Sequence, residues 1–313
     1  MEKYKKTSLS DNQKYPSFCD LAAKNDEVFE NFRKNSVYSA IVESVRYKLG
    51  KKYLKIINSQ TPELVNWFDK FRENDRYGSP YIYDYGKYGR FSPTTLRYIK
   101  VLSDLIIIFG DLKNMKIIEI GGGYGGQCKI ISDFFNINSY SIVDLKPSLD
   151  LSKKYLDKLR VKNVSFLTSD DLLNKEKKYD LVISNYAFSE CLRPIQNFYF
   201  EKVIRNSERG YIIWNFINEK TGFDLYTIEE FSEKIKNARV IVAKPHSFSA
   251  TRILFWDDNK KLFCFSLCYL ARIENAIINF FPIIYMNLVI FLKQNFPRLY
   301  YALKKIKKKI LEN

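Results

Sequence analysis

Histidine and cysteine are scarce in this chain of 313 residues, and their scarcity excludes several kinds of chemistry. His246 is the single histidine, and the five cysteines form no C-x-x-C pair, so we expect no zinc site and assign no metal ligand. The cysteines are scattered and odd in number, and residues 1–10 are polar without an apolar signal core. These features predict a reduced, cytoplasmic protein.

The chain also lacks an apolar run of the roughly 20 residues that a membrane-spanning helix needs. Residues 277–292 are strongly apolar but contain Asn279, Pro282 and Asn287, and the end that follows carries seven basic residues and one acidic residue. Residues 277–313 therefore suit two alternatives, which both stay open. One is a peripheral contact with the inner face of a membrane, and the other is a subunit contact in a homo-oligomer.

Acidic residues are fewer than basic ones by 16, which gives a pI near 9.4. Such a balance suits a polyanionic partner. However, Lys, Ile, Asn, Phe and Tyr are abundant throughout the chain, as an AT-rich genome would produce. Charge alone therefore does not favour nucleic acid as a partner.

Glycine is sparse, yet five of the twelve glycines lie within residues 121–126. An apolar run precedes them and a helical pattern over residues 127–135 follows, which predicts a strand, a tight loop and a helix. We expect the loop's main-chain N–H groups to close on a ligand, since a turn without a ligand leaves the entropy cost of the glycines unexplained. The spacing G-x-G-x-x-G fits a dinucleotide. A carboxylate at Glu119 would repel a pyrophosphate but suits an ammonium and a sulfonium.

Strands alternate with helices from about residue 115 to residue 256, which predicts an α/β fold with a mostly parallel sheet and helices on both faces. We divide the chain into three parts. Residues 1–110 form a helical extension with a Tyr-rich loop at 81–91, residues 111–258 form the ligand-binding domain, and residues 259–313 form an apolar and basic helical tail. Ser92 and Pro93 predict the start of a well-capped helix that leads into the first strand.

Polar residues follow the predicted strands at the edge where a doubly wound sheet binds its ligand. Asp144 comes 23 residues after Gly121 and is placed to accept both ribose hydroxyls, with Leu145 next to it. The fourth strand, residues 179–184, leads into a segment that we place near the transferred group. Its polar residues are Asn185, Tyr186, Ser189 and Glu190.

Three segments together resemble the sugar O-methyltransferases encoded among bacterial surface-polysaccharide genes, within the class I S-adenosylmethionine-dependent methyltransferases. They are YGRFSPTTLRYI from Tyr88, EIGGGYGGQ from Glu119 and DLVISNYAFSEC from Asp180. The resemblance covers residues 81–256 and implies a seven-stranded Rossmann-like fold. It also implies S-adenosylmethionine as methyl donor and a carbohydrate hydroxyl as acceptor, carried by a nucleotide sugar, a lipid-linked chain or a polymer.

The resemblance assigns roles to individual residues. The resemblance implies that an acidic residue after the third strand accepts a hydrogen bond from the adenine amino group. The candidates are Asp170, with Ser169 and Asp171 beside it. Helix capping or binding of a divalent ion would also explain these residues. The remaining cofactor residues are Glu119, Gly121, Gly122, Gly123, Tyr124, Gly125, Gln127, Asp144, Leu145 and Asn185.

A sugar hydroxyl stays protonated at neutral pH, so methyl transfer to it requires a general base, for which His246 and Glu190 are the candidates. We expect Tyr88, Arg90, Tyr186 and Ser189 to contact the acceptor. The Pro-Pro of base N-methyltransferases is missing after Asn185, which argues against a nucleic-acid acceptor. Two alternatives stay open: a dinucleotide-dependent sugar oxidoreductase, and a degenerate methyltransferase domain that acts as a membrane or assembly partner.

Overall fold

The computed structural model describes residues 13–173, 177–215, 223–245 and 251–258. All of them belong to the first of two units into which the chain divides, Met1–Asn259 and Lys260–Asn313. His246, Cys264, Cys268 and residues 277–313 lie outside the described residues, so what we predict for them stays a prediction. In the described part of the chain, no helix combines the length and apolarity required to cross a membrane.

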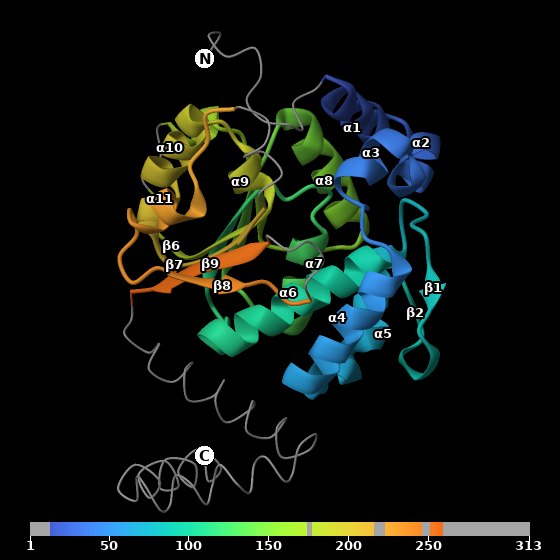
Figure 1. The fold of residues 1–313 in the computed structure, drawn as a ribbon. Coiled ribbons are helices and arrows are strands. Elements are labelled where there is room, and N and C mark those ends of the chain that lie inside the picture. The colour runs from blue at the N-terminus through green and yellow to red at the C-terminus, as the bar shows by residue number, and fades with distance from the viewer. Residues whose placement is uncertain (1–12, 174–176, 216–222, 246–250, 259–313) are drawn as a thin grey trace, which may run out of the picture. The chain divides into compact units, whose positions relative to one another are not determined.

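A seven-stranded sheet runs through this unit in the order β5-β4-β3-β6-β7-β9-β8 (Figure 1). The first five strands of this order are parallel, and β9 is antiparallel to both of its neighbours. The predicted seven-stranded, mostly parallel sheet is therefore confirmed. The strands are β3 (Lys116–Ile120), β4 (Ser139–Val143), β5 (Val164–Leu167), β6 (Tyr179–Asn185), β7 (Ser207–Trp214), β8 (Arg239–Val242) and β9 (Arg252–Asp257).

Helices cover both faces of the sheet, because successive side chains of a strand point to opposite faces. Ile118 of β3 joins a buried cluster with Phe188 and Phe231 from the helices of one face. On the other face, Tyr211 of β7 donates from its hydroxyl to Asp104, at 2.6 Å. These helices are α6 (Pro93–Phe109), α7 (Gly126–Phe134), α8 (Lys146–Lys158), α9 (Ala187–Glu190), α10 (Arg193–Lys202) and α11 (Ile228–Ser232).

The N-terminal extension consists mainly of helices, and it packs on the sheet domain within the same unit. Helix α1 packs against α8, and α4 packs against α6 (Figure 1). Short 3₁₀ turns separate several of the helices. The helices of the extension are α1 (Lys14–Lys24), α2 (Asp26–Asn31), α3 (Ser36–Ile41), α4 (Tyr47–Gln60) and α5 (Phe68–Phe71).

The Tyr-rich segment forms a small hairpin, which corrects the predicted loop. Strand β1 (Tyr83–Asp84) pairs antiparallel with β2 (Arg90–Phe91) around a 3₁₀ turn. The turn closes because Gly86 and Gly89 adopt φ values of 66° and 81°. Residues with a side chain rarely adopt such positive values. The helix that follows starts as predicted, since the Ser92 side chain accepts from the Thr95 N–H at 3.1 Å and Pro93 takes the first position.

A buried arginine, Arg33, ties the extension to the start of α6. Its guanidinium lies 2.6 Å from the Glu43 carboxylate and 3.1 Å from the Asp75 carboxylate. It also donates to the Ser92 hydroxyl at 3.1 Å and to the Asn74 carbonyl at 2.9 Å. Each charge in this group is therefore compensated although the guanidinium is fully buried.

Replacing this arginine should destabilise the protein. We expect Arg33→Ala to lower the free energy of unfolding by about 3–5 kcal/mol, because it leaves two carboxylates buried without their cation. Urea unfolding followed by circular dichroism measures the change. The control is Lys24→Ala, which removes an exposed ion pair with Asp20 and should change the free energy by about 0–1 kcal/mol. Equal effects of the two variants would contradict the assignment.

Candidate functional site

The glycine loop joins β3 to α7 at the point where the strand order reverses, as predicted. Packing accounts for most of its glycines. A Cβ added at Gly121 would lie 2.1 Å from Ala187, and one added at Gly122 would lie 2.5 Å from Ile142. A Cβ at Gly125 would meet α8 at 2.7 Å. The expectation that a turn without a ligand leaves the glycines unexplained is therefore wrong.

Three N–H groups of the loop are donated within the protein. Gly121 donates to the Val143 carbonyl at 2.8 Å, Gly125 donates to the carbonyl of Gly122 at 2.9 Å, and Gly123 donates to the Asp144 carboxylate at 3.1 Å. The expectation that the N–H groups close on a ligand is wrong for these three. These three donors are therefore not free to bind an anion.

Glu119 is 1% exposed and lies beneath the loop at the end of β3. It accepts from the Tyr140 hydroxyl at 2.8 Å and from the Asn185 amide nitrogen at 3.4 Å. Burial raises the pKa of its carboxyl to about 8, although the bond from Tyr140 acts in the opposite direction. At neutral pH this group is mostly protonated, so the expected repulsion between Glu119 and a pyrophosphate is weak in this protein.

Asn185, at the end of β6, is the centre of a polar chain. Its amide nitrogen also donates to the Gln127 side chain at 3.3 Å, and Gln127 donates to the Tyr98 carbonyl of α6 at 3.2 Å. The chain thus joins three residues predicted for the cofactor, Glu119, Gln127 and Asn185, to helix α6. The Asn185 side-chain oxygen is buried and has no hydrogen-bond partner among the described residues.

The N-terminal extension covers the glycine loop, which the sequence reasoning missed. A Cβ added at Gly123 would lie 3.7 Å from Val42 and 4.0 Å from the Tyr38 hydroxyl. Tyr38 is fully buried and stacks on Tyr15 of α1, with ring centroids 5.6 Å apart. Its hydroxyl has no partner in the described part of the chain. The Tyr-rich composition of the extension was the available signal, but nothing in the pattern linked it to this loop.

Arg97 of α6 is a second residue that the sequence reasoning did not select. It is 9% exposed, and its guanidinium lies 5.8 Å from the centre of the Tyr186 ring and 5.3 Å from that of Tyr98. One terminal nitrogen donates to the Val42 carbonyl at 3.1 Å, while Nε is buried without a partner. No carboxylate of the described residues forms a direct ion pair with Arg97, and Glu43, which pairs with Arg33, interacts with it only through longer-range electrostatics.

The segment after β6 contains two of the four residues predicted to contact the acceptor, Tyr186 and Ser189, and the candidate base Glu190. Tyr186 has a φ of 76°, which is rare for a residue with a side chain and is found at functional sites. The Ser189 hydroxyl donates to the Tyr186 carbonyl at 2.7 Å and so holds this turn. Burial raises the pKa of Glu190, whose carboxylate accepts from the Asn215 amide at 2.6 Å. Asn215, at the end of β7, was not predicted.

Asp144 lies at the end of β4, beside the glycine loop, as predicted. Its two carboxylate oxygens accept from the N–H groups of Gly123 and Leu145, at 3.1 and 2.8 Å, and burial raises its pKa. Each carboxylate oxygen can accept a further bond, so the ribose role stays a prediction. Leu145 contributes the residue before α8.

Residues after β5 reach the same edge of the sheet but form a local turn. Asp171 accepts hydrogen bonds from the main-chain N–H and the hydroxyl of Thr168, both at 2.8 Å. These local bonds agree with the alternative that the acidic residues stabilise the turn. Asp170 is exposed at the start of this 3₁₀ turn, directly after Ser169. Across the described ranges, no group of three or more His, Cys, Asp or Glu side chains is arranged to hold a metal ion.

Three predicted residues are placed elsewhere. The Tyr124 side chain is fully buried, accepts from the Asn74 amide at 3.2 Å and lies under the Arg33 guanidinium, so only its main chain can face a ligand of the loop. Tyr88 lies against α4, and Arg90 is exposed on β2. The structure therefore places Tyr88 beside α4 rather than at the glycine loop.

Comparison with known proteins gives matches to solved structures alone. No protein-family model and no curated protein matches the chain. One solved structure is an rRNA methylase from Streptococcus thermophilus, with 13% identity over 51% of this chain and 96% of that chain and a TM-score of 0.39. Another is a SAM-dependent methyltransferase from Aquifex aeolicus, with 18% identity over 51% of this chain and 88% of that chain and a TM-score of 0.37.

The buried Glu119 should make stability depend on pH. Because its pKa in the folded protein is about 8 and the ordinary value is 4.5, the folded protein keeps a proton that the unfolded chain has lost. The free energy of unfolding of the wild type should therefore fall as the pH rises from about 4.5 to about 8, by at most about 1.4 kcal/mol per pH unit. The Glu119→Gln variant lacks this proton and should not show the fall. Chemical unfolding at pH 5–9 measures the difference.

The matched control is Glu63→Gln, at an exposed glutamate. Its difference from the wild type should stay constant over the same range of pH. If the free energy of unfolding of Glu119→Gln also changes with pH in parallel with that of the wild type, the raised pKa of Glu119 is refuted.

Proposed function

We propose that the chain is an S-adenosylmethionine-dependent methyltransferase. The observation that carries this proposal is a set of three unpaired buried atoms: the Asn185 side-chain oxygen, the Tyr38 hydroxyl near Gly123, and Nε of Arg97, whose guanidinium also donates to the Val42 carbonyl. The first is an acceptor without a donor, and the last is a charged donor without an acceptor. Together they complement an amino acid, whose ammonium would bind at Asn185 and whose carboxylate would bind at Arg97.

The same contacts argue against a dinucleotide. A pyrophosphate at a glycine loop depends on free main-chain N–H groups, and those of Gly121, Gly123 and Gly125 are donated elsewhere. Glu119, with a pKa raised to about 8, offers only weak repulsion at neutral pH, so the argument depends on the N–H groups that are already donated.

The residues of the chain would bind and orient the donor rather than activate it. S-adenosylmethionine, when bound, supplies a methyl group on a sulfonium that is already reactive. An ammonium at Asn185 would lie next to Glu119 and favour loss of its proton, so the site would gain a negative charge where the ligand is positive. The cover formed by Tyr38 and Val42 would exclude water from this end.

We further propose that the acceptor is a carbohydrate hydroxyl. The resemblance of the three segments supports it, together with Tyr186, which has a positive φ, and the half-buried Glu190, both of which follow β6. A carboxylate with a raised pKa is a better match to proton abstraction near neutral pH than an exposed one. Glu190 is therefore the candidate general base among the described residues, and His246 stays the second candidate.

Calorimetry with S-adenosylhomocysteine tests the cofactor. We expect the wild type to bind it and Arg97→Met to bind it about ten- to a hundredfold more weakly, because a bond to a charged group is lost. The control is Arg205→Met, at an exposed arginine after α10. It should leave the affinity within about twofold, since an exposed ion pair contributes little.

The outcomes separate the three functions. Binding of S-adenosylhomocysteine but not NAD supports the proposal, and binding of NAD alone would favour the oxidoreductase. If neither ligand binds the wild type, the domain is a degenerate one, and the enzymatic proposal is refuted.

Turnover tests the base. With a panel of sugar phosphates and nucleotide sugars as acceptors, Glu190→Gln should lower the methyl-transfer rate by roughly 10²–10⁴ without changing the affinity for S-adenosylhomocysteine. The control is Glu201→Gln, at an exposed glutamate of α10. A near wild-type rate in Glu190→Gln would remove Glu190 and leave His246, for which His246→Ala is the corresponding variant.

A further inference from the structure

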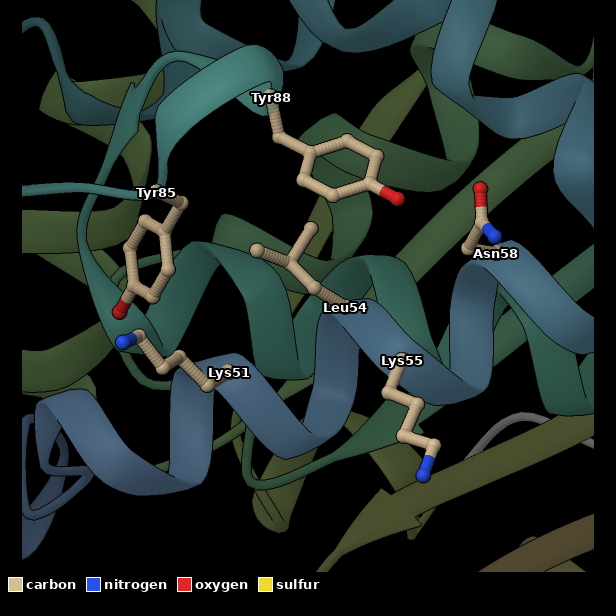
Figure 2. Close-up of a pocket in the computed structure, with 6 residues that line it drawn as sticks. All are labelled: Lys51, Leu54, Lys55, Asn58, Tyr85 and Tyr88. Carbon is tan, nitrogen blue, oxygen red and sulfur yellow. The ribbon is translucent and has the colours of Figure 1, made fainter.

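A hollow of about 310 Å³ lies between helix α4 and the small hairpin (Figure 2). It is separate from the glycine loop, and none of the roles assigned above uses it except that predicted for Tyr88. Its lining joins apolar, aromatic, amide and cationic side chains from two elements: Lys51, Leu54, Lys55 and Asn58 from α4, and Tyr85 and Tyr88 from the hairpin.

The two tyrosines that line the hollow differ in their burial. Tyr85 is 7% exposed, and its hydroxyl is buried without a hydrogen-bond partner in the described residues. Tyr88 is half-buried, and Figure 2 shows its ring extending over Leu54 with the hydroxyl directed toward Asn58. Rings that cover an apolar floor, with an amide and a hydroxyl at the rim, suit a ligand that has both apolar and polar faces.

The charge of this wall has one sign. Helix α4, over Tyr47–Gln60, carries four lysines and no acidic residue. Lys51 and Lys55 come from successive turns, and neither forms an ion pair within the described part of the chain. Two ammonium groups without carboxylate partners favour an anionic ligand, which a lysine binds as a point charge.

We propose that this hollow binds an anionic saccharide, with the sugar ring against Tyr88 and the phosphate or carboxylate at Lys51 and Lys55. The proposal rests on the proposed function, because it names the class of acceptor. Helix α4 connects the two places. Tyr53, next to Leu54, is buried and lies close enough to Tyr186 for their hydroxyls to interact electrostatically. One helix therefore lines the hollow and approaches the acceptor side of the methyl-transfer site.

Calorimetry on the full chain tests the hollow directly. The probes are glucose 1-phosphate, glucuronate, methyl glucoside and inorganic phosphate. We expect one of the two anionic sugars to bind at least tenfold more tightly than methyl glucoside and inorganic phosphate, and the preferred sugar tells a phosphate from a carboxylate. The double variant Lys51→Ala/Lys55→Ala should weaken this binding at least tenfold, and Tyr88→Ala should weaken it more than Tyr88→Phe.

The matched control is Lys48→Ala/Lys52→Ala, which removes the same charge from exposed positions of the same helix outside the hollow. It should leave the affinity within twofold. Three outcomes would each overturn the proposal. The two double variants could lose affinity for the anionic sugar equally, methyl glucoside could bind as tightly as the anionic sugar, or inorganic phosphate could bind as tightly as the sugars. S-adenosylhomocysteine is titrated in parallel. If S-adenosylhomocysteine binds and no anionic sugar does, only the proposal for the hollow is refuted. If S-adenosylhomocysteine does not bind, the proposed function is refuted.

Discussion

The fully buried guanidinium of Arg33 is the interaction on which the rest of this structure depends. It joins Glu43, after α3, to Asp75 and to Ser92, which caps α6. The group therefore fixes the extension that covers the glycine loop and the helix that carries Arg97. Because each charge is compensated by directed bonds, the arrangement has one geometry rather than several. The candidate site is built on a polar cluster, not on the sheet alone.

The sheet and its helices could be predicted because their signals are local. An apolar run followed by glycine and a capping serine before proline each act within a few residues, and each appears as expected. The hairpin around Gly86 was missed because its strands are two residues long and too polar to show alternation. Its pairing depends on packing against α4, which no local pattern contains.

The candidate site was predicted in part, for the same reason. Strand ends in a doubly wound sheet meet at one edge, so Glu119, Asp144, Asn185 and Glu190 lie where topology requires. The partners that determine their chemistry come from distant segments. Tyr38 approaches Gly123 across 85 positions of sequence, and burial by such segments raises the pKa of Glu119. Sequence spacing identifies a carboxyl group but not its burial, and burial decides whether that group is charged.

Glycine spacing alone cannot distinguish the ligands that a loop of this kind binds. Here most of the glycines are required by the close approach of Ala187, Ile142 and α8, and three of the N–H groups that would bind a phosphate are already donated. What distinguishes the ligands is the remaining set of unsatisfied atoms. A buried acceptor at Asn185 and a buried cation at Arg97 are both destabilising in isolation, and opposite charges on one ligand would satisfy both. In the proposed function, the loop would place the ligand, and the unpaired atoms of Asn185 and Arg97 would select its chemistry.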